Sequence, residues 1–273
     1  MKHCPICRGE TDPAGDGLLK CRGCGLAFKG EKYFGSPVYQ PGIEGDIYTG
    51  AKKELFDAAL DRLQGLLRGP GRLLDVGCAG GDLLKTAAGR GWQGEGVEID
   101  PALAGKAVEA GFKVYMSPVE AAGLEAAAYD AATVFEVFCL MGSPAEAVAG
   151  IYKALKPGGV IYIREFNAAF HLTLRRLELA GVFKPLGASP AVIHNFNFSP
   201  RSLRALLGRA GFRETQIRNS RPTSGDPYRT GGRLGGLFTG LLKFLYYRLA
   251  QALWYASFGR VYAGSSLIVT ARK

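Results

Sequence analysis

A glycine-rich turn between an apolar run and a helical pattern constrains this sequence more than any other stretch. Residues 73–84 read Leu-Leu-Asp-Val-Gly-Cys-Ala-Gly-Gly-Asp-Leu-Leu. The apolar run is typical of a buried strand, and leucines recur at helical spacing after the turn. Gly77, Gly80 and Gly81 let the chain turn sharply and let a ligand approach the backbone. This order predicts the nucleotide-binding corner of a doubly wound α/β domain.

The spacing of these glycines and one carboxylate narrow the choice of nucleotide. Dinucleotide-binding turns carry G-x-G-x-x-G and present bare backbone amides to a pyrophosphate. This chain has G-x-x-G-G instead, and Asp75 lies two residues before the first glycine. A carboxylate there would repel a pyrophosphate but suits a cationic ligand that bears an amine. The run from Asp75 to Gly81 resembles motif I of class I S-adenosylmethionine-dependent methyltransferases.

Later signals follow the order of that family's fold. Glu98 lies near the end of a second predicted strand, where an acidic side chain accepts both ribose hydroxyls in doubly wound folds. The Pro-Gly-Gly turn at 157–159 also resembles the family's signature before its fifth strand. The resemblance covers residues 50–273 and implies a seven-stranded, Rossmann-like α/β sheet. Further strands are expected at 94–100, 112–116, 160–163, 213–220 and 265–271, and residues 129–140 are expected to be the fourth strand and its exit.

Helix signals accompany these strands. An amphipathic pattern predicts a helix over Ala51–Arg68. Asp100 precedes a helical pattern over 102–110, and Ser199 with Pro200 precedes another over 201–210. Both are residues that cap helix N-termini.

The resemblance implies a set of residues around S-adenosylmethionine. In the family, a backbone amide reads the edge of the adenine, and an acidic residue often precedes it. Here Pro118 stands in place of that acidic residue, so the backbone of Val119 is expected to contact the adenine. Relatives carry Glu-Val-Leu-Glu-His after the fourth strand, whereas this chain has Cys139 and Leu140 in place of the Glu-His. The implied cofactor residues are Asp75, Gly77, Cys78, Ala79, Gly80, Gly81, Glu98, Ile99, Val119 and Phe135.

The acceptor side is expected after the fifth strand. Methyl transfer needs a nucleophile aligned about 3 Å from the sulfonium methyl in a site that excludes water. A general base is required only where the nucleophile keeps a proton of high pKa. The catalytic candidates are His194 and Glu165, with His171 as a third, and His194 is preferred because an apolar Phe-Asn-Phe-Ser run follows it. A purely structural role stays open for each.

Four cysteines near the N-terminus form C-x2-C-x13-C-x2-C: Cys4, Cys7, Cys21 and Cys24. Two such pairs can ligate one tetrahedral ion, so we expect a zinc ribbon over residues 1–30. Four protein ligands leave no open position, so this zinc is structural, and it supplies the folding energy of so short a unit. An iron–sulfur site and a metal-free ribbon are the alternatives. Residues 31–50, rich in Gly, Pro and Tyr, are expected to be a linker or a lid, and the methyltransferase domain takes 51–273.

The net charge of +10 is unevenly placed. Residues 171–273 contain 16 Lys and Arg against 3 Asp and Glu, whereas residues 1–170 contain 18 against 21. This asymmetry favours an anionic partner, namely a phosphorylated substrate, a membrane surface or a nucleic acid. A basic surface that only aids solubility is the alternative.

Residues 222–262 form an apolar and aromatic insertion before the last strand. Charges recur in it every few residues, so one or two amphipathic helices are expected rather than a transmembrane span. Residues 234–262 are compatible with a peripheral membrane contact, a cover over the active site or a homodimer contact.

The resemblance implies an enzyme that methylates a small molecule, a sugar or a lipid- or carrier-linked glycan. The four-cysteine ribbon joined to this domain is similar to members that modify sugars, glycan precursors or natural products. Methylation of a ribosomal RNA base and a non-catalytic cofactor-binding scaffold are the rivals; nucleic acid is less favoured because the basic residues mix with apolar ones. The absence of a signal-peptide pattern after Met1 predicts a cytoplasmic protein, peripheral at the membrane if the insertion docks there.

Overall fold

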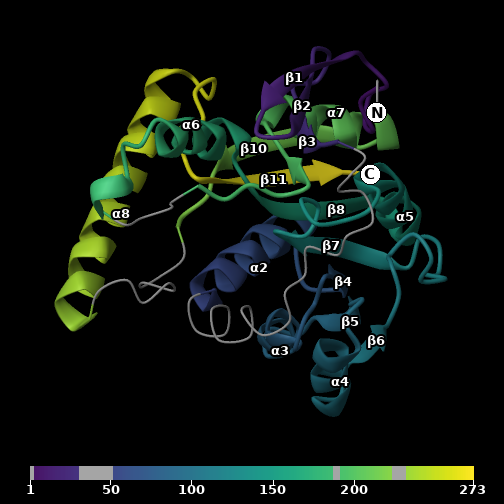
Figure 1. The fold of residues 1–273 in the computed structure, drawn as a ribbon. Helices are drawn as coiled ribbons and strands as arrows, with labels where there is room; N and C mark the ends of the chain where they lie inside the picture. The colour runs from purple at the N-terminus through teal and green to yellow at the C-terminus, as the bar shows by residue number, and fades with distance from the viewer. Residues whose placement is uncertain (1–2, 31–51, 187–190, 223–231) are drawn as a thin grey trace.

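The computed structural model describes residues 3–30, 52–186, 191–222 and 232–273 of the 273-residue chain. The predicted linker or lid over 31–50 lies outside the described residues. The described chain forms a central seven-stranded sheet with helices on both faces, and a small N-terminal sheet that packs against it (Figure 1).

The central sheet has the strand order β10-β11-β8-β7-β4-β5-β6. The strands from β4 to β8 pair in parallel, whereas β11 runs antiparallel to both of its neighbours. Because β4 comes first and its neighbours β5 and β7 lie on opposite sides, the strand order reverses at the end of β4. This is where doubly wound sheets bind ligands, and the topology confirms the predicted fold class. The strands are β4 Arg72–Val76, β5 Gln93–Val97, β6 Lys113–Tyr115, β7 Tyr129–Phe135, β8 Leu155–Phe166, β10 Arg213–Asn219 and β11 Ser266–Arg272.

Two helices begin at the caps that the sequence predicts. The side chain of Asp100 accepts the backbone amides of Ala102 and Leu103, and Ser199 forms a capping box with Ser202. Both predicted N-caps are therefore confirmed. The helices are α2 Lys53–Leu67, α3 Asp82–Ala88, α4 Pro101–Glu109, α5 Pro144–Ala154, α6 Ala168–Leu179, α7 Pro200–Ala210 and α8 Gly232–Ala256, with a short 3₁₀ helix η2 at Lys184–Leu186.

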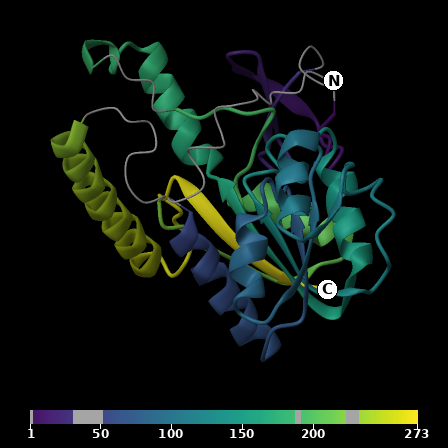
Figure 2. The same ribbon diagram turned by 90° about the horizontal axis from the view of Figure 1, so that it is seen from below.

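Alternation along the strands divides the core into two layers. Leu73 of β4 and Tyr162 of β8 pack with α2 and α3 on one face, while Leu74 and Ile163 pack with α5 and α7 on the other. Strand side chains alternate between faces, so each strand of the centre serves both layers. Figure 2 shows α2 and α3 covering one face of the sheet.

Two strand boundaries differ from the sequence expectation. β8 begins at Leu155 rather than at 160, because Leu155 already pairs with Tyr129 and residues 156–159 bulge between that pair and the next one. Gly158 has φ +79° within the bulge, a conformation that glycine adopts at little cost. β5 ends at Val97 rather than at residue 100, whereas β7 ends at Phe135 and residues 136–140 form its expected exit.

The N-terminal sheet has the order β1-β2-β3-β9, and its last strand comes from a distant part of the chain. The bounds are β1 Thr11–Gly15, β2 Leu18–Cys21, β3 Ala27–Lys29 and β9 Phe196–Asn197. Asn197 Nδ2 donates to Ala27 O at 3.3 Å across 170 residues of sequence. Leu26 and Phe28 share one hydrophobic core with Phe198 and the α5/α7 face. The ribbon is thus fused to the main domain, and its boundary at residue 30 stays a prediction.

The insertion before the last strand contains one described helix, α8, which lies beside β10 at the edge of the sheet (Figures 1 and 2). Asn219 Nδ2 donates to Ala250 O at 3.1 Å, and Gln251 Nε2 donates back to Asn219 O at 3.3 Å. Within the described ranges, no helix combines the length and the apolar character needed to cross a membrane.

Candidate functional site

Side chains of neighbouring elements pack closely against the glycine turn after β4. The φ of Gly77 is +76°, and a Cβ there would lie 2.4 Å from Val137 Cγ2. Gly81 has φ +84°, and a Cβ there would lie 3.1 Å from the Cβ of Ala107 in α4. The amide of Gly77 donates to Val97 O at 2.8 Å, which fixes the turn beside the end of β5. Larger residues at 77 and 81 would therefore push the turn away from its neighbours.

Glu98 joins the turn to the end of β5. Its Oε2 accepts the amide of Ala79 at 3.0 Å, and its Oε1 accepts the amide of Asp100 at 2.9 Å. Each carboxylate oxygen has a second lone pair, so two further donors can be accepted. The carboxylate is held in place on the edge of the sheet where the strand order reverses, as the predicted ribose contact requires.

Asp75 lies beneath the turn and is almost without solvent contact. Its Oδ1 accepts the hydroxyl of Thr133 at 2.7 Å. The pKa of Asp75 is raised to about 7, mainly by burial. The Thr133 hydrogen bond and the charge of Lys52 oppose this rise, and the negative charge of Glu98 adds to it. A ligand cation placed here would favour the ionised carboxylate.

Two predicted cofactor residues turn their side chains into the protein. The thiol of Cys78 points at Gly96, where a Cβ would lie 2.4 Å from Cys78 Sγ. The ring of Phe135 packs edge-on against Phe56 at 5.1 Å and stacks on Tyr162 at 5.7 Å. Only the backbone of each is thus placed to meet a ligand.

Ile99 and Val119 differ in exposure. Ile99, next to Glu98, is 62% exposed, which is high for a large apolar side chain, whereas Val119 is buried. An uncovered apolar side chain beside the Glu98 carboxylate fits a planar ring that rests on it. These contacts, the glycine turn and the two carboxylates are chemically compatible with S-adenosylmethionine.

A buried ion cluster lies at the exit of β7, and the sequence did not predict it. Lys52 Nζ lies 2.8 Å from Glu136 Oε2, and Arg164 pairs with Glu136 Oε1. All three side chains are less than a tenth exposed. Glu136 adopts φ +60°, a strained conformation for a non-glycine residue. One signal was available, since a lysine at a helix N-terminus opposes the helix dipole and so needs an anionic partner.

Glu165 is fully buried at the end of β8. Its Oε2 accepts the amide of Cys139 at 3.2 Å, and its Oε1 accepts the amide of Phe166 at 2.9 Å. Burial raises the pKa of Glu165 to about 7, against the effect of these amides. The carboxylate thus braces the exit of β7 against β8, which favours a positioning role over the predicted direct role in proton transfer.

His171 and His194 lie on either side of Phe166, with ring centroids 5.5 and 5.1 Å from its own. Both nitrogens of His171 are engaged, by Val192 N and by Ser265 O, so this ring is structural. His194 Nε2 is shielded from solvent and has no hydrogen-bond partner among the described residues. Burial lowers the pKa of His194 to about 4, helped by His171 and Lys29, so its ring is neutral at pH 7.

Doubly wound sheets occur in several families of nucleotide-binding proteins, and a comparison with known families identifies the family of this chain. A family profile described as a methyltransferase domain matches residues 48–217, more than half of the chain. The chain belongs to this methyltransferase family. The match confirms the resemblance seen in the glycine turn, and it also covers the ion cluster, His171 and His194 of the methyltransferase.

Known relatives of this methyltransferase include two proteins of one name. This chain is 35% identical over 103 residues to the ubiquinone biosynthesis O-methyltransferase of Burkholderia multivorans. The matched segment covers 35% of this chain and 44% of that protein. This chain is also 29% identical over 175 residues to the protein of the same name from Xanthomonas axonopodis pv. citri. This match covers 60% of this chain and 70% of that protein. The match thus spans less than half of the Burkholderia protein.

The fold of the methyltransferase also matches a solved structure. The S-adenosylmethionine dependent methyltransferase of Mesorhizobium loti superposes with a TM-score of 0.55 at 16% identity, over 85% of this chain and all of that one. At this identity the likeness concerns the fold alone.

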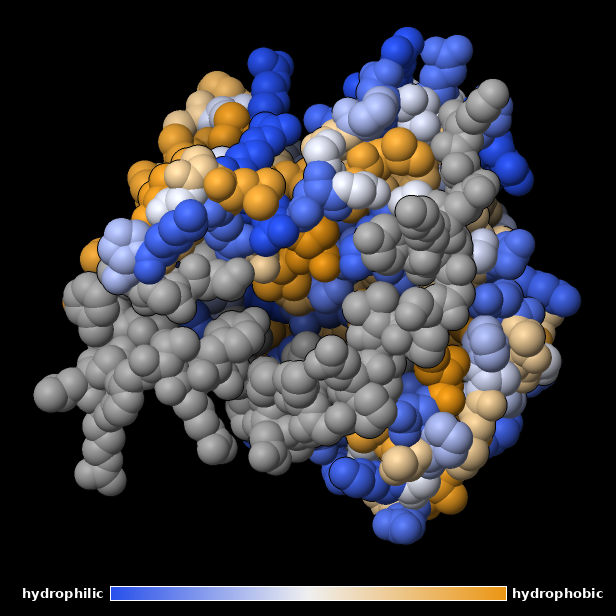
Figure 3. All heavy atoms as spheres, viewed as in Figure 1, coloured by the Kyte–Doolittle hydropathy of each residue, from blue (hydrophilic) through white to orange (hydrophobic). Residues whose placement is uncertain are grey.

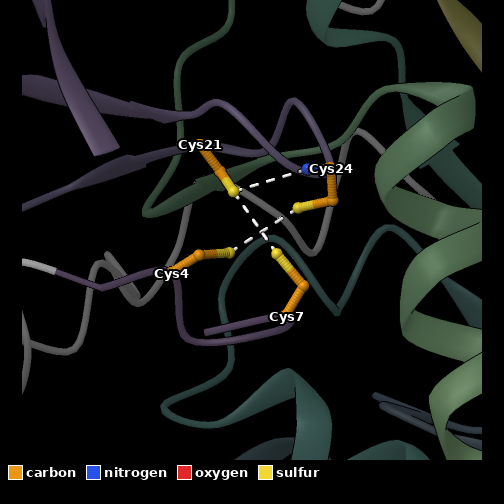
Figure 4. Close-up of side chains that lie close together, drawn as sticks. All are labelled: Cys4, Cys7, Cys21 and Cys24. Atoms are coloured by element: carbon orange, nitrogen blue, oxygen red, sulfur yellow. Dashed lines mark hydrogen bonds between the residues drawn. The ribbon is translucent and has the colours of Figure 1, made fainter. Parts of the chain in front are cut away.

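The four N-terminal cysteines of the methyltransferase converge on one point (Figure 4). Their sulfur atoms all lie within 4.8 Å of one another, with Cys4 and Cys24 at 3.6 Å and Cys7 and Cys21 at 3.3 Å. Sulfurs around a tetrahedral zinc with Zn–S bonds of about 2.3 Å lie about 3.8 Å apart, so the set fits this ion.

The backbone around the sulfurs is shaped to the cluster. A Cβ on Gly9 or on Gly23 would lie 3.3 Å from Cys7 Sγ. The residues that follow each cysteine pair, Arg8 and Gly25, have positive φ, so both loops turn sharply around the sulfurs. The amide of Cys24 points at Cys21 Sγ at 3.4 Å, as expected for a donor to a thiolate.

Proposed function

We propose that this methyltransferase moves the methyl group of S-adenosylmethionine to a hydroxyl oxygen of a small-molecule acceptor. The observation that carries the proposal is the Glu98 carboxylate, tied to the glycine turn through Ala79 and lying beside buried Asp75. Family membership supports the transferred group. The O-methyltransferase names of the relatives support oxygen as the accepting atom.

Each residue of the turn has a distinct task in binding the cofactor. Glu98 accepts the ribose hydroxyls, and Asp75 holds the cationic amino acid end. Ile99 and the backbone of Val119 hold the adenine, while Gly77, Gly80 and Gly81 allow close backbone approach. When bound, S-adenosylmethionine supplies an activated methyl group.

The acceptor hydroxyl must lose a proton, and His194 is the proposed base. Its neutral ring has a free nitrogen, and Phe166 at the acceptor edge of the sheet holds it. Glu165 fixes the exit of β7 by accepting the amide of Cys139. A pKa near 4 keeps the ring unprotonated throughout the neutral range, although it also makes the ring a weaker base than a free imidazole.

The charge of the C-terminal third bears on the class of acceptor. A basic C-terminal third favours an acceptor with anionic groups, so sugar phosphates and carrier-linked glycans belong in the test panel beside phenols. Zinc bound by the four cysteines is proposed as structural, because the set leaves no open coordination position.

The affinity for S-adenosylmethionine is expected to fall at acidic pH through Asp75. Because its pKa is raised to about 7, the carboxyl is protonated at lower pH and must lose that proton to hold a cation. The dissociation constant should rise about tenfold per pH unit below pH 7. Calorimetric titration between pH 5.5 and 7.5 measures this. Asp75→Asn should bind weakly at every pH, and a flat wild-type profile contradicts the assignment.

Replacing His194 with glutamine is expected to lower kcat by about 10²–10⁴-fold, because the acceptor proton loses its base. The assay follows transfer of a radiolabelled methyl group to the acceptor panel. Affinity for S-adenosylhomocysteine should stay unchanged, which separates a base from a residue that only supports the fold. His171→Gln is the matched histidine variant, and it should lower stability rather than kcat in the folded fraction. Equal kcat for wild type and His194→Gln contradicts this role.

A further inference from the structure

The outward face of α8 is apolar. Leu241, Phe244, Leu245, Leu249 and Leu253 are all between 42% and 60% exposed. They recur at helical spacing and form one stripe along the helix, which we call the α8 leucine face. A surface helix of a globular protein normally turns such a stripe toward the core. Here it is turned toward solvent.

The opposite side of α8 is already attached to the protein. Ala250 is buried, Tyr246 donates its hydroxyl to Ala263 O, and Gln251 bonds to Asn219 of β10. The ring of Tyr246 also contacts Phe170 of α6 at 5.4 Å. The helix is therefore held in place by its aromatic and polar side chains. The α8 leucine face is left as a docking surface rather than as a cover over the site.

The charge around this face is of one sign. The sequence contains no Asp or Glu from residue 227 to residue 273. Arg248 is exposed within the α8 leucine face, and Arg260 is exposed just beyond the helix. Figure 3 shows apolar side chains gathered at the upper left, where α6 and the end of α8 lie, with hydrophilic ones among them. Leucines interleaved with arginines complement a surface that is apolar inside and anionic outside.

This charge argues against a second copy as the occupant. In a two-fold dimer the same face meets itself, so the basic helices of both copies would lie together. The helix offers no carboxylate to pair with Arg248 of the other copy. Nucleic acid would leave the leucines without apolar contact, because its groove edges and phosphates are polar.

We propose that α8 lies in the plane of an anionic membrane, with its leucine face at the boundary of headgroups and acyl chains. Arg248 and Arg260 then meet lipid phosphates. The helix follows β10 in the chain. Asn219 of β10 pairs with Leu267 of β11, and Leu267 pairs with Glu165 at the end of β8. Docking thus occurs at the acceptor edge of the sheet. The contact does not depend on methyl transfer and can be measured without it.

The test is flotation of the full chain with vesicles of phosphatidylcholine, with and without about 30% phosphatidylglycerol. Binding should be at least tenfold tighter to the anionic vesicles and should weaken with added salt. Leu245→Glu/Leu249→Glu should lower the partition constant by about a hundredfold, since each leucine contributes about tenfold. Arg248→Gln should reduce the preference for anionic vesicles.

The matched control is Val108→Glu, which places an acidic residue at a 46% exposed apolar position on α4 and should float as wild type does. Thermal unfolding and binding of S-adenosylhomocysteine verify that the double variant is folded. The proposal is overturned if neither vesicle binds the wild type, or if the double variant binds as well. It is also overturned if sedimentation equilibrium finds a wild-type dimer that the double variant loses, since a second copy then covers the face.

Discussion

Replacing Cys21 with serine is expected to lower the zinc content from about one ion per chain to near zero and to destabilise more than the ribbon. Structural zinc contributes about 10–16 kcal/mol to the folding of isolated ribbons. Here β3 pairs with β9, and Leu26 and Phe28 belong to the core that contains Phe198. Metal loss should therefore expose β9 as well as the N-terminal strands.

Elemental analysis together with amide hydrogen exchange measures both parts of this expectation. Exchange should accelerate in residues 3–30 and at β9, but not in β4 or β7. Cys78→Ser, a buried cysteine outside the cluster, should keep its zinc. Iron with visible absorption in the wild type would favour the iron–sulfur alternative. A Cys21→Ser protein with wild-type exchange at β9 would contradict the coupling.

Glu136→Gln is expected to lower the free energy of unfolding by about 3–5 kcal/mol, because it leaves Lys52 and Arg164 as buried cations without their shared carboxylate. Urea unfolding measures the change. The matched variant is Glu10→Gln, which removes an exposed partner of Arg22 and should cost less than about 1 kcal/mol. If the two variants lose equal stability, the cluster has no such role.

Local signals in the sequence predicted the nucleotide corner and most strands and helices of the main sheet, but not α6 or β9. Gly77 and Gly81 require positive φ where β4 meets α3, and the Asp100 and Ser199 caps fixed two helix starts. These features depend on residues a few positions apart. Their conformational preferences act within one turn, so the sequence reports them directly.

Contacts between distant residues leave no local signal in the sequence. Lys52 and Glu136 are 84 positions apart, and β3 pairs with β9 across about twice that distance. Nothing in their own neighbourhoods shows that they meet, because the meeting depends on how the sheet and ribbon pack. The periodicity over 234–262 did indicate an amphipathic helix, but not that its leucines face solvent. Which face is covered is decided by tertiary packing.

The N-terminal sheet also contacts the segments that lie at the proposed acceptor edge of the main sheet. Lys29 N donates to Asn195 O at 2.9 Å, and His194 is the preceding residue. Arg175 of α6 pairs with Asp16 of the ribbon at 2.7 Å. The proposed base is therefore positioned partly by the N-terminal sheet, so a metal held by the four cysteines would also help to shape the proposed acceptor site.

The glycine turn and Glu98 are expected to hold S-adenosylmethionine together, and calorimetric titration of wild type and Glu98→Ala measures their contribution. The wild type should bind the cofactor at one site per chain. Glu98→Ala should weaken binding by about 2–4 kcal/mol, because two charge-assisted hydrogen bonds to the ribose are lost. Glu109→Ala, at an exposed position on α4, should bind as the wild type does. Equal affinity of Glu98→Ala and wild type would show that Glu98 does not hold the ribose.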